Sequence, residues 1–566
     1  MQFNLIDEKW IPVKRRDGSE TMIAPWEVTD LFAENPVGLL NAPRPDFNGA
    51  LIQFLIGLVQ TVAAPANRME WKVKLNKPPE PEELKTKFAS VRHAFELGGE
   101  GPRFMQDLEK LEADEGCIDG LLIDMPGDST RKMNKDHFVK RNTVACMCPT
   151  CCATALFTMQ TNAPEGGRGY LTSLRGGGPL TTLVLGDERH SSLWHSIWLN
   201  TLVNDDFLRI CGNSNKNTDS DKFPWLGKTR TGVETAPIEV HPVQMYWGMP
   251  RRIRLNLEKG EQGQCDICGI YSDDLIVSYR EKIQGNNYKG AWLHPLSPFF
   301  YKNNAPSAIH AQPGGVSYRN WLGFVQEDSS NQRVPARIVH EFREVRMQSD
   351  WQFRLWAFGY DMTHNNARCW YDSVMPIITV NPDNVKNYGN ETANLIRTAD
   401  IICGNTKIAI KRATQGRPQF DSLTRNIKWK YQDIKKIPSD EQDERKKVLY
   451  AIKDQSTFMA IDVFFWQNTE KAFYVALYSL KKAFEVADDS VEIYKTWHGA
   501  LCKASLELFD FNFSEGLIED VDPKRVVLAR RELERFNSGN KIKELLTLPV
   551  EQKPVGKEKK KKAQKV

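Results

Sequence analysis

The chain has 566 residues, of which 41% are hydrophobic, and its 76 Lys and Arg residues against 72 Asp and Glu residues give a formal net charge of +4. This length exceeds what one hydrophobic core usually supports, so two or three domains are expected. The nearly balanced charge excludes general basicity as the source of any nucleic-acid affinity, which would have to come from local patches.

The start of the chain and its cysteine content predict a soluble protein of the cytoplasm. The chain begins without an apolar signal region, and 11 cysteines, an odd number, favour a reducing compartment over a disulfide scaffold. Residues 3–6 and 10–13 have the composition of short strands, and the turn at Asp17-Gly18 predicts a hairpin with residues 20–23. The apolar stretch 50–64 is about as long as a core helix and ends before Pro65.

A basic segment follows, at residues 131–141, with five Lys and Arg residues around Phe138. Such charge runs are often no more than a solvated surface, and that interpretation stays open here. Because the segment directly precedes a predicted metal site, we favour a loop that faces nucleic acid. Lys140 and Arg141 would then contact phosphate, and Phe138 would stack on a base or fill a protein pocket.

Two cysteine pairs with two intervening residues each give the strongest chemical signal in the chain. Each pair offers two thiolates at the spacing that one tetrahedral zinc ion accepts, and the cost of closing the long intervening loop grows only logarithmically with its length. The predicted zinc ligands are Cys148, Cys151, Cys265 and Cys268. Cys146 and Cys152 flank the first pair and remain alternative ligands, and the competing interpretation is a set of ordinary buried cysteines.

Two glycine-rich segments follow the first cysteine pair, at residues 165–170 and 174–179. They are not dinucleotide-binding fingerprints, because the spacing and the flanking order of strand, turn and helix are wrong. Glycine loops let a backbone approach a ligand closely, although a mobile surface loop explains these residues equally well.

The segments beyond the glycine-rich region alternate between strand and helix patterns. Residues 179–185 predict a strand and residues 193–203 a helix, while residues 250–257 alternate basic and apolar side chains, as in a half-buried strand with a cationic outer face. Residues 345–358 predict another strand, which leads into a polar loop that starts at residue 359.

Helical periodicity dominates after a change of composition near residues 382–389. Helices are predicted near 391–413, 440–481, 484–509 and 523–537, and together they suggest an antiparallel bundle. The expected fold class is therefore α+β. A mixed N-terminal domain with a structural zinc site spans residues 1–385, an all-α four-helix bundle spans 386–545, and a disordered basic tail spans 546–566.

Catalytic motifs are scarce in this sequence. It contains no P-loop, no Gly-x-Ser-x-Gly elbow and no His-Glu-x-x-His motif. His137 and His294 would suit a histidine–metal nuclease, but no compact Asp/His/Asn cluster has the required spacing, and four cysteines would close the zinc shell. The sequence therefore argues against an enzyme, with a zinc-dependent nuclease and a plain structural scaffold as the competing hypotheses.

Several segments, taken in order, carry a resemblance to a known family. They are Asn4-Leu-Ile-Asp with Trp10-Ile-Pro-Val, the early buried helix ending in Ala64-Pro, the two cysteine pairs, Ser173-Leu-Arg-Gly-Gly-Gly-Pro-Leu-Thr-Thr, Trp292-Leu-His-Pro-Leu-Ser-Pro and the helical C-terminal part. In this order the chain resembles the CasA family, the large subunits of type I-E CRISPR Cascade complexes. The resemblance covers most of the length and leaves out the basic tail.

The resemblance implies a non-catalytic subunit of an RNA-guided complex of antiviral defence, with a structural zinc ion and a C-terminal four-helix bundle. Such a subunit recognises the protospacer-adjacent motif in double-stranded DNA, helps to unwind the target for guide-RNA pairing, and recruits a helicase-nuclease. The implied partners are therefore the other Cascade subunits with their guide RNA, the target DNA and the helicase-nuclease, without a membrane.

The resemblance also assigns roles to particular residues. It places minor-groove contacts on Glu165–Gly169, called the glycine loop below, and on Lys282. It places a wedge that inserts beside the motif on the loop Asn365–Arg368. The implied DNA-binding residues are Gly166, Gly167, Arg168, Gly169, Lys282, Asn365, Asn366, Ala367 and Arg368. Contact with the guide RNA and the complex falls on the loop of Phe138, Lys140 and Arg141. Better-known members have glutamine where this chain has Asn366, and Arg168 and Arg368 add charge, so a different preferred motif is expected.

Overall fold

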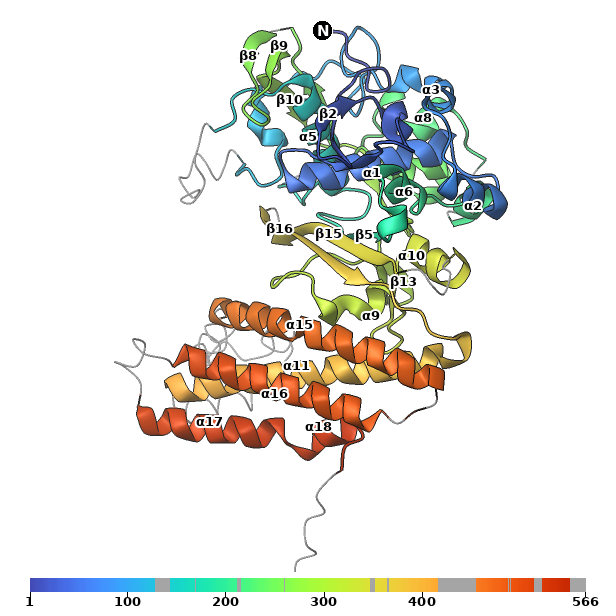
Figure 1. The fold of residues 1–566 in the computed structure, drawn as a ribbon. Coiled ribbons are helices and arrows are strands. Elements are labelled where there is room, and N and C mark those ends of the chain that lie inside the picture. The colour runs from blue at the N-terminus through green and yellow to red at the C-terminus, as the bar shows by residue number, and fades with distance from the viewer. Residues whose placement is uncertain are drawn as a thin grey trace, which may run out of the picture. The chain divides into compact units, whose positions relative to one another are not determined.

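The computed structural model describes residues 1–127, 143–167, 169–210, 215–258, 260–346, 352–363, 366–415, 455–486, 488, 490–513 and 522–549. The chain divides into two compact units (Figure 1). The first comprises Met1–Val316 and Asn320–Thr379, and the second comprises Ser317–Arg319 together with Val380–Val566. Three residues from the middle of the chain thus belong to the second unit, and no local pattern of composition or periodicity marks them.

The first unit contains both helices and strands. Its helices are α1 (Pro45–Val62), α2 (Arg68–Asn76), α3 (Pro81–Ala89), α5 (Pro149–Asn162), α6 (Leu193–Trp198), α7 (Asn204–Ile210), α8 (Asp219–Lys222), α9 (Trp321–Phe324) and α10 (Arg337–Glu341). Its strands are β1 (Ile11–Arg15), β2 (Glu20–Ile23), β3 (Val37–Leu40), β4 (Glu115–Cys117), β5 (Thr181–Leu185), β6 (Glu234–Thr235), β7 (Arg252–Leu255), β8 (Glu261–Gln264), β9 (Tyr271–Leu275), β10 (Ser278–Lys282), β11 (Asn287–Tyr288), β12 (Phe299–Lys302), β13 (Ala305–Ala308), β14 (Arg333–Val334), β15 (Arg354–Thr363) and β16 (Asn366–Pro376).

Helix α1 forms the centre of the first unit's core, as its apolar sequence predicts. Pro45 occupies the first turn, where a proline costs no hydrogen bond, and the ring of Phe54 lies in the middle of the helix. Five aromatic rings lie edge-on to Phe54 with centroids 5.3 to 5.9 Å away, a favourable arrangement. One of them is Phe157 of α5. The helix whose start carries the first cysteine pair therefore packs against the core.

The sheets of the first unit are small. The strand orders are β2-β1-β3, β4-β10-β7, β16-β15-β5, β13-β12-β14, β8-β9 and β11-β6, and only the last pair is parallel. Two of these sheets carry expected site residues. In one, Lys282 at the end of β10 lies opposite Arg252 of β7, and in the other Thr363 of β15 lies opposite Asn366 of β16.

Several expectations from the sequence are wrong. Residues 345 and 346, expected at the start of a strand, belong instead to the π-helix Phe342–Arg346, and β15 begins at Arg354. Residues 3–6 form no strand, and only Asn4 makes an isolated bridge with Glu96. The polar loop expected from residue 359 is instead the continuation of β15, which pairs with β16 up to Thr363. Arg251 and Arg252, expected on a cationic outer face, are only 6% and 8% exposed.

The buried position of Arg252 has a clear physical reason. Its Nε donates to Oδ2 of Asp107 over 2.6 Å, and Asp107 is itself fully buried. Paired charges of this kind can be buried where a single charge cannot. Periodicity along one strand does not reveal a partner that lies 145 positions away.

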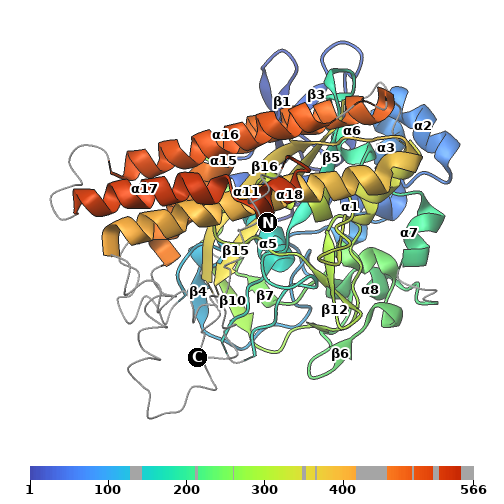
Figure 2. The same cartoon turned by 90° about the horizontal axis from the view of Figure 1, so that it is seen from below.

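The second unit is helical throughout its described part. Its helices are α11 (Val385–Gln415), α15 (Gln455–Val486), α16 (Val491–Asn512), α17 (Pro523–Asn537) and α18 (Asn540–Leu545). The four long helices among these run side by side in both views (Figures 1 and 2). The expected α+β class with a C-terminal helical bundle is confirmed. Among the described helices of the whole chain, none is both long enough and apolar enough to cross a bilayer.

The segment Ser317–Arg319 adds one large buried side chain to the second unit. The side chain of Tyr318 is fully buried in the bundle, where its ring stacks on Phe473 at 4.3 Å between centroids. Its hydroxyl lies 2.8 Å from Oγ1 of Thr469 on α15. The bundle core is therefore completed by a residue that precedes the first bundle helix in the sequence.

Candidate metal centre and nucleic-acid interface

The first cysteine pair lies at the start of helix α5. Cys148 is the N-cap residue, and its Sγ accepts a hydrogen bond from the amide of Cys151 over 3.5 Å. Pro149 follows in the first helical turn, where its fixed φ favours the helix. The carbonyl of Cys148 accepts from the amide of Cys152 over 2.9 Å, so the turn that carries both thiols is fixed by the helix itself.

The second pair lies in the tight turn between β8 and β9. The amide of Cys265 donates to the carbonyl of Ile270 over 3.0 Å, and the amide of Gly269 donates to the carbonyl of Cys265 over 2.8 Å. Gly269 has a φ of +72°, a left-handed conformation that favours glycine. The residue after Cys268 therefore closes this turn, as its composition predicts.

Backbone hydrogen bonds join the two cysteine turns directly. Met147 and Ile276 exchange two such bonds, of 3.0 and 2.8 Å. Oδ2 of Asp266 also accepts from the amides of Ala145 and Cys146, over 2.7 and 3.0 Å. Sequence reasoning missed Asp266, and its place inside the second cysteine pair is the only signal that pointed to it. The two segments are thus held together by contacts other than the cysteines.

The thiols of the four predicted zinc ligands form one cluster. The Sγ atoms of Cys148, Cys151, Cys265 and Cys268 all lie within 4.8 Å of one another. The Sγ atoms of Cys148 and Cys268 are 3.7 Å apart, close to the edge of about 3.8 Å that a tetrahedron with Zn–S bonds of about 2.3 Å would have. Three of the four side chains are buried and Cys268 is half-buried. The donor set therefore fits a metal ion that prefers four thiolates.

The flanking cysteines are not members of this cluster. Sγ of Cys146 donates to the carbonyl of Gln264 over 3.3 Å and lies 3.5 Å from Oδ2 of Asp266. Cys152 is fully buried, and burial raises the pKa of its thiol. The thiols that cluster are therefore those of the two spaced pairs.

The glycine loop begins directly after α5 ends and returns toward strand β10. The amide of Tyr170 donates to the carbonyl of Gly167 over 3.1 Å, which closes a tight turn. Gly169 has a φ of +90°, and its carbonyl accepts from the amide of Gln284 over 2.8 Å. Because Gln284 follows Lys282 by two residues, the expected groove-contacting loop and lysine lie side by side.

The immediate surroundings of Lys282 leave its charge available. The side chain is exposed at the end of β10. Within the described ranges of the chain, no carboxylate lies at ion-pair distance from its Nζ, unlike Arg280 of the same strand, which pairs with Glu115 over 3.1 Å. A cation in this position can contact a polyanion without first breaking an ion pair.

The expected wedge residues begin strand β16. Asn366 is exposed and lies opposite Thr363, so it belongs to the paired end of the β15–β16 hairpin and not to the polar loop that the sequence predicted. Nη2 of Arg368 donates to Oδ1 of the buried Asp361 over 2.5 Å. Arg368 therefore has one partner within the hairpin already, and Ala367 is half-buried beside it.

A second glycine segment joins this hairpin to the glycine loop. The amide of Gly178 donates to the carbonyl of Asn162, the last residue of α5, over 3.1 Å. A Cβ on Gly178 would lie 2.8 Å from the carbonyl oxygen of Tyr360 and from Cγ of Met362 in β15. The hairpin thus packs on Gly178, Gly178 bonds the end of α5, and the glycine loop that follows α5 bonds the end of β10.

Phe138, Lys140, Arg141, Arg168 and Asn365 lie outside the described residues.

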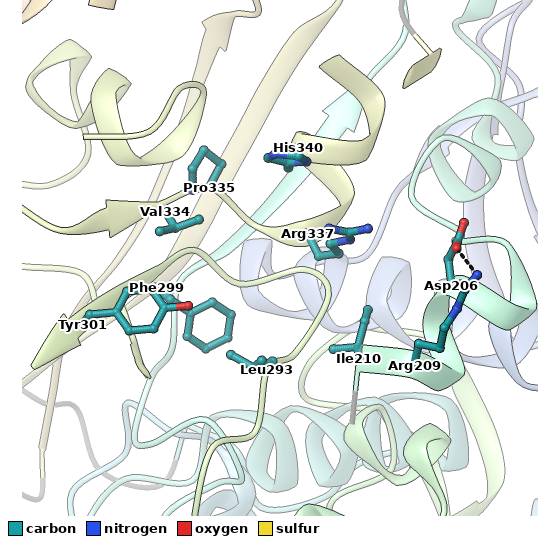
Figure 3. Close-up of a pocket in the computed structure, with 10 residues that line it drawn as sticks. All are labelled: Asp206, Arg209, Ile210, Leu293, Phe299, Tyr301, Val334, Pro335, Arg337 and His340. Atoms are coloured by element: carbon teal, nitrogen blue, oxygen red, sulfur yellow. Dashed lines mark hydrogen bonds and ion pairs between the residues drawn. The ribbon is translucent and has the colours of Figure 1, made fainter. Parts of the chain in front are cut away.

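A separate cavity of 530 Å³ lies elsewhere in the first unit. Figure 3 shows the rings of Phe299 and Tyr301 beside aliphatic side chains, with the ion pair of Asp206 and Arg209 at one side. Its lining residues are Asp206, Arg209, Ile210, Leu293, Phe299, Tyr301, Val334, Pro335, Arg337 and His340. None of them belongs to the cysteine cluster or to the expected nucleic-acid interface.

Comparison with known proteins agrees with the resemblance seen in the sequence. A structure of Thermobifida fusca Cse1 superposes with a TM-score of 0.65 at 16% identity and covers 96% of this chain and 98% of that chain. A structure of Thermus thermophilus CasA, also named Cse1, gives 0.59 at 15% identity over 96% and 99% of the two chains. A chain of a CRISPR RNA-guided surveillance complex gives 0.62 at 12% identity over 95% and 100%. The family model of CRISPR-associated protein Cse1 matches residues 4–508, and the chain therefore belongs to the Cse1 family.

Proposed function

We propose that this chain is the non-catalytic large subunit of a type I-E CRISPR Cascade surveillance complex and recognises the protospacer-adjacent motif in double-stranded DNA. The observation that carries the proposal is the hydrogen bond from Gln284 to Gly169, which holds the glycine loop beside the exposed Lys282. Membership of the Cse1 family and the similarity to a chain of an RNA-guided surveillance complex support the same role.

The glycine loop, Lys282 and the β15–β16 hairpin have a chemistry that suits a minor groove. That groove presents a degenerate pattern of acceptors, so an open glycine backbone and one lysine would accept several related motifs. Gly167 supports a close approach, because a Cβ built there would meet nothing within 4 Å. The hairpin tip at Asn366 would act as the wedge that separates base steps, at a cost of a few kcal/mol that groove and phosphate contacts offset.

The cysteine cluster supports a structural zinc site in this proposal. Four thiolates fill a tetrahedral shell and leave no position for a water nucleophile, whereas catalytic zinc sites keep one position open. The cluster joins the start of α5 to the β8–β9 turn, and α5 and β9 lead on to the glycine loop and to β10. The zinc-dependent nuclease is the alternative, and no feature of the described donor set favours it.

The implied partners follow from the same proposal. The subunit would assemble with the other Cascade subunits and their guide RNA, bind target DNA, help to unwind it and recruit the helicase-nuclease. The segment around Phe138 would contact the guide RNA and its holding subunit.

Target binding by the guide-loaded complex, with and without this chain, would test the proposal. A library of sequences flanking one target should show a clear motif preference only when the chain is present. Equal binding to all flanking sequences in its presence would instead favour a plain scaffold. Metal-dependent cleavage of DNA by the purified chain would favour the nuclease.

A further inference from the structure

The buried side chain of Arg251 contacts the residues on both sides of the glycine loop. Arg251 directly precedes β7 and is 6% exposed. Its amide donates to Oε1 of Gln160 over 2.9 Å, and its carbonyl accepts from Nε2 of Gln160 over 3.0 Å. Gln160 belongs to α5, so the backbone of Arg251 is fixed to the helix that starts at the cysteine cluster.

The guanidinium of Arg251 contacts three segments at once. Its Nη2 donates to the carbonyl of Pro164 over 2.6 Å, and its central carbon lies 4.8 Å from the centroid of the Tyr170 ring. Its Nη1 lies 3.7 Å from Oε1 of Glu281. Pro164 precedes the glycine loop, Tyr170 follows it, and Glu281 directly precedes Lys282. One side chain therefore joins both ends of the loop to the strand that carries the lysine.

The first glycine of the loop fits this arrangement closely. A Cβ on Gly166 would lie 2.2 Å from Cβ of Tyr170 and 3.1 Å from Nη1 of Arg251. The first distance is far below any real contact between carbon atoms, so a side chain at this position would push the loop away from the ring and the guanidinium. Gly167, the next residue, meets no such restriction.

Stability alone is a poor explanation for this buried charge. Burial lowers the pKa of Arg251 and raises the pKa of Glu281 to about 7, so the surroundings disfavour the charged form of both groups. Nε of Arg251 has no hydrogen-bond partner in the described part of the chain. Well-packed apolar side chains often stabilise such positions as well as an ion pair does. An arginine adds directional bonds to a backbone carbonyl and a ring face, which an apolar side chain lacks.

We propose that Arg251 is a positioning residue, which holds both ends of the glycine loop against β10 so that the loop backbone and Lys282 face the same groove of the DNA. The part of this inference that concerns DNA rests on the proposed function. The positioning itself is a property of the free chain and can be measured without DNA.

Amide hydrogen exchange of residues 165–170 in the free full-length chain would test the positioning directly. In Arg251→Met these amides should exchange at least about tenfold faster than in the unsubstituted chain, because opening of the loop would then cost less. Arg251→Lys should restore part of the protection, since a lysine keeps the charge but reaches fewer of the three contacts. Arg254→Met is the matched control from the adjoining strand β7, because Arg254 bonds the carbonyl of Asp107 instead of the loop.

Unchanged exchange in a folded Arg251→Met chain would overturn the inference. Should that variant fail to fold, Gly166→Ala provides the second test, since its methyl group would enter the space between the loop and Tyr170. Faster exchange limited to the loop supports the inference, and unchanged exchange in folded Gly166→Ala overturns it. A loop that exchanges faster while the complex keeps its full motif preference would contradict the proposed function but leave the positioning role intact.

Discussion

The amide of Gln284 donates a hydrogen bond to the carbonyl of Gly169 over 2.8 Å. This one bond joins the glycine loop to the strand end that carries Lys282, although the two residues are far apart in the sequence. A Cβ on Gly169 would lie only 3.0 Å from Cβ of Ile283, so the close approach of the two segments depends on glycine.

The cysteine cluster should bind about one zinc ion per chain. Cys265→Ser should lower zinc content and stability together, because metal binding contributes of order 10 kcal/mol to folding in small zinc peptides. Elemental analysis and thermal unfolding of the purified chain would measure both. Cys146→Ser is the matched control, because Cys146 lies beside the cluster but bonds a backbone carbonyl instead. A folded wild-type chain with well under one zinc ion would contradict this assignment.

Gly167→Asp should abolish motif recognition without unfolding the chain. A side chain at this position has open space around it, so the fold should tolerate it, while its carboxylate would face the phosphates of the groove. Motif-dependent DNA binding by the assembled complex and circular dichroism of the free chain would check the two halves of the prediction. Gly101→Asp provides a control, since a side chain there also has open space. Equal losses in both variants would argue against a specific role for the loop.

Lys282→Ala should weaken binding of the complex to target DNA. A phosphate contact predicts a loss shared by all motifs and a salt dependence reduced by about one phosphate. A base-edge contact predicts a loss of about 1–3 kcal/mol that depends on the base pair. Titrations at several salt concentrations would distinguish the two. Lys289→Ala serves as the control in the neighbouring exposed segment, and unaltered binding by Lys282→Ala would remove the lysine from the interface.

Asn366→Ala should spare docking at the motif but slow the opening of the duplex. The hairpin of β15 and β16 holds Asn366 at its tip, and a wedge acts on base stacking rather than on the first encounter. Binding rates on an intact duplex and on a target with a melted bubble beside the motif should therefore differ for this variant. Equal impairment on both substrates would show that another residue of the tip is the wedge.

Stability should depend on pH through Glu281. Burial raises the pKa of this carboxyl from 4.5 to about 7, so the folded chain holds its proton more tightly than the unfolded chain does. Its contribution to stability is complete below pH 4.5 and is lost as the pH rises toward 7. Between about pH 5 and about pH 8 the loss should be about 2 kcal/mol. Glu281→Gln should remove this loss in urea unfolding curves, and a pH dependence that persists unchanged in the variant would assign it to other groups.

Much of the metal site could be predicted from the sequence because each half of it is local. A helix start with Pro149 and a tight turn closed by Gly269 fix the two thiols of each pair within a few residues. The same holds for α1 and for the bundle helices, whose periodicity reflects contacts between near neighbours. Such features depend little on the rest of the chain.

The contacts that assemble the interface could not be predicted, because their partners lie far apart in the sequence. Periodicity placed Arg251 on an outer face, whereas its guanidinium is buried against Pro164, Tyr170 and Glu281, which come from other segments. The amides of Ala145 and Cys146, whose hydrogen bonds Asp266 accepts, precede it by 121 and 120 positions. The polar composition of β15 beyond Phe358 suggested a loop, since pairing with β16 leaves no mark on local hydropathy.

Tyr318 has a consequence for the order in which the molecule forms. Its hydroxyl partner Thr469 is 151 positions further along the chain. At about 5–20 residues per second, a ribosome needs about 8–30 seconds to add a segment of that length. During this interval a large aromatic side chain of the nascent chain has no bundle to enter. The side chain of Tyr318 therefore stays uncovered until the helix that carries Thr469 and Phe473 has been synthesised.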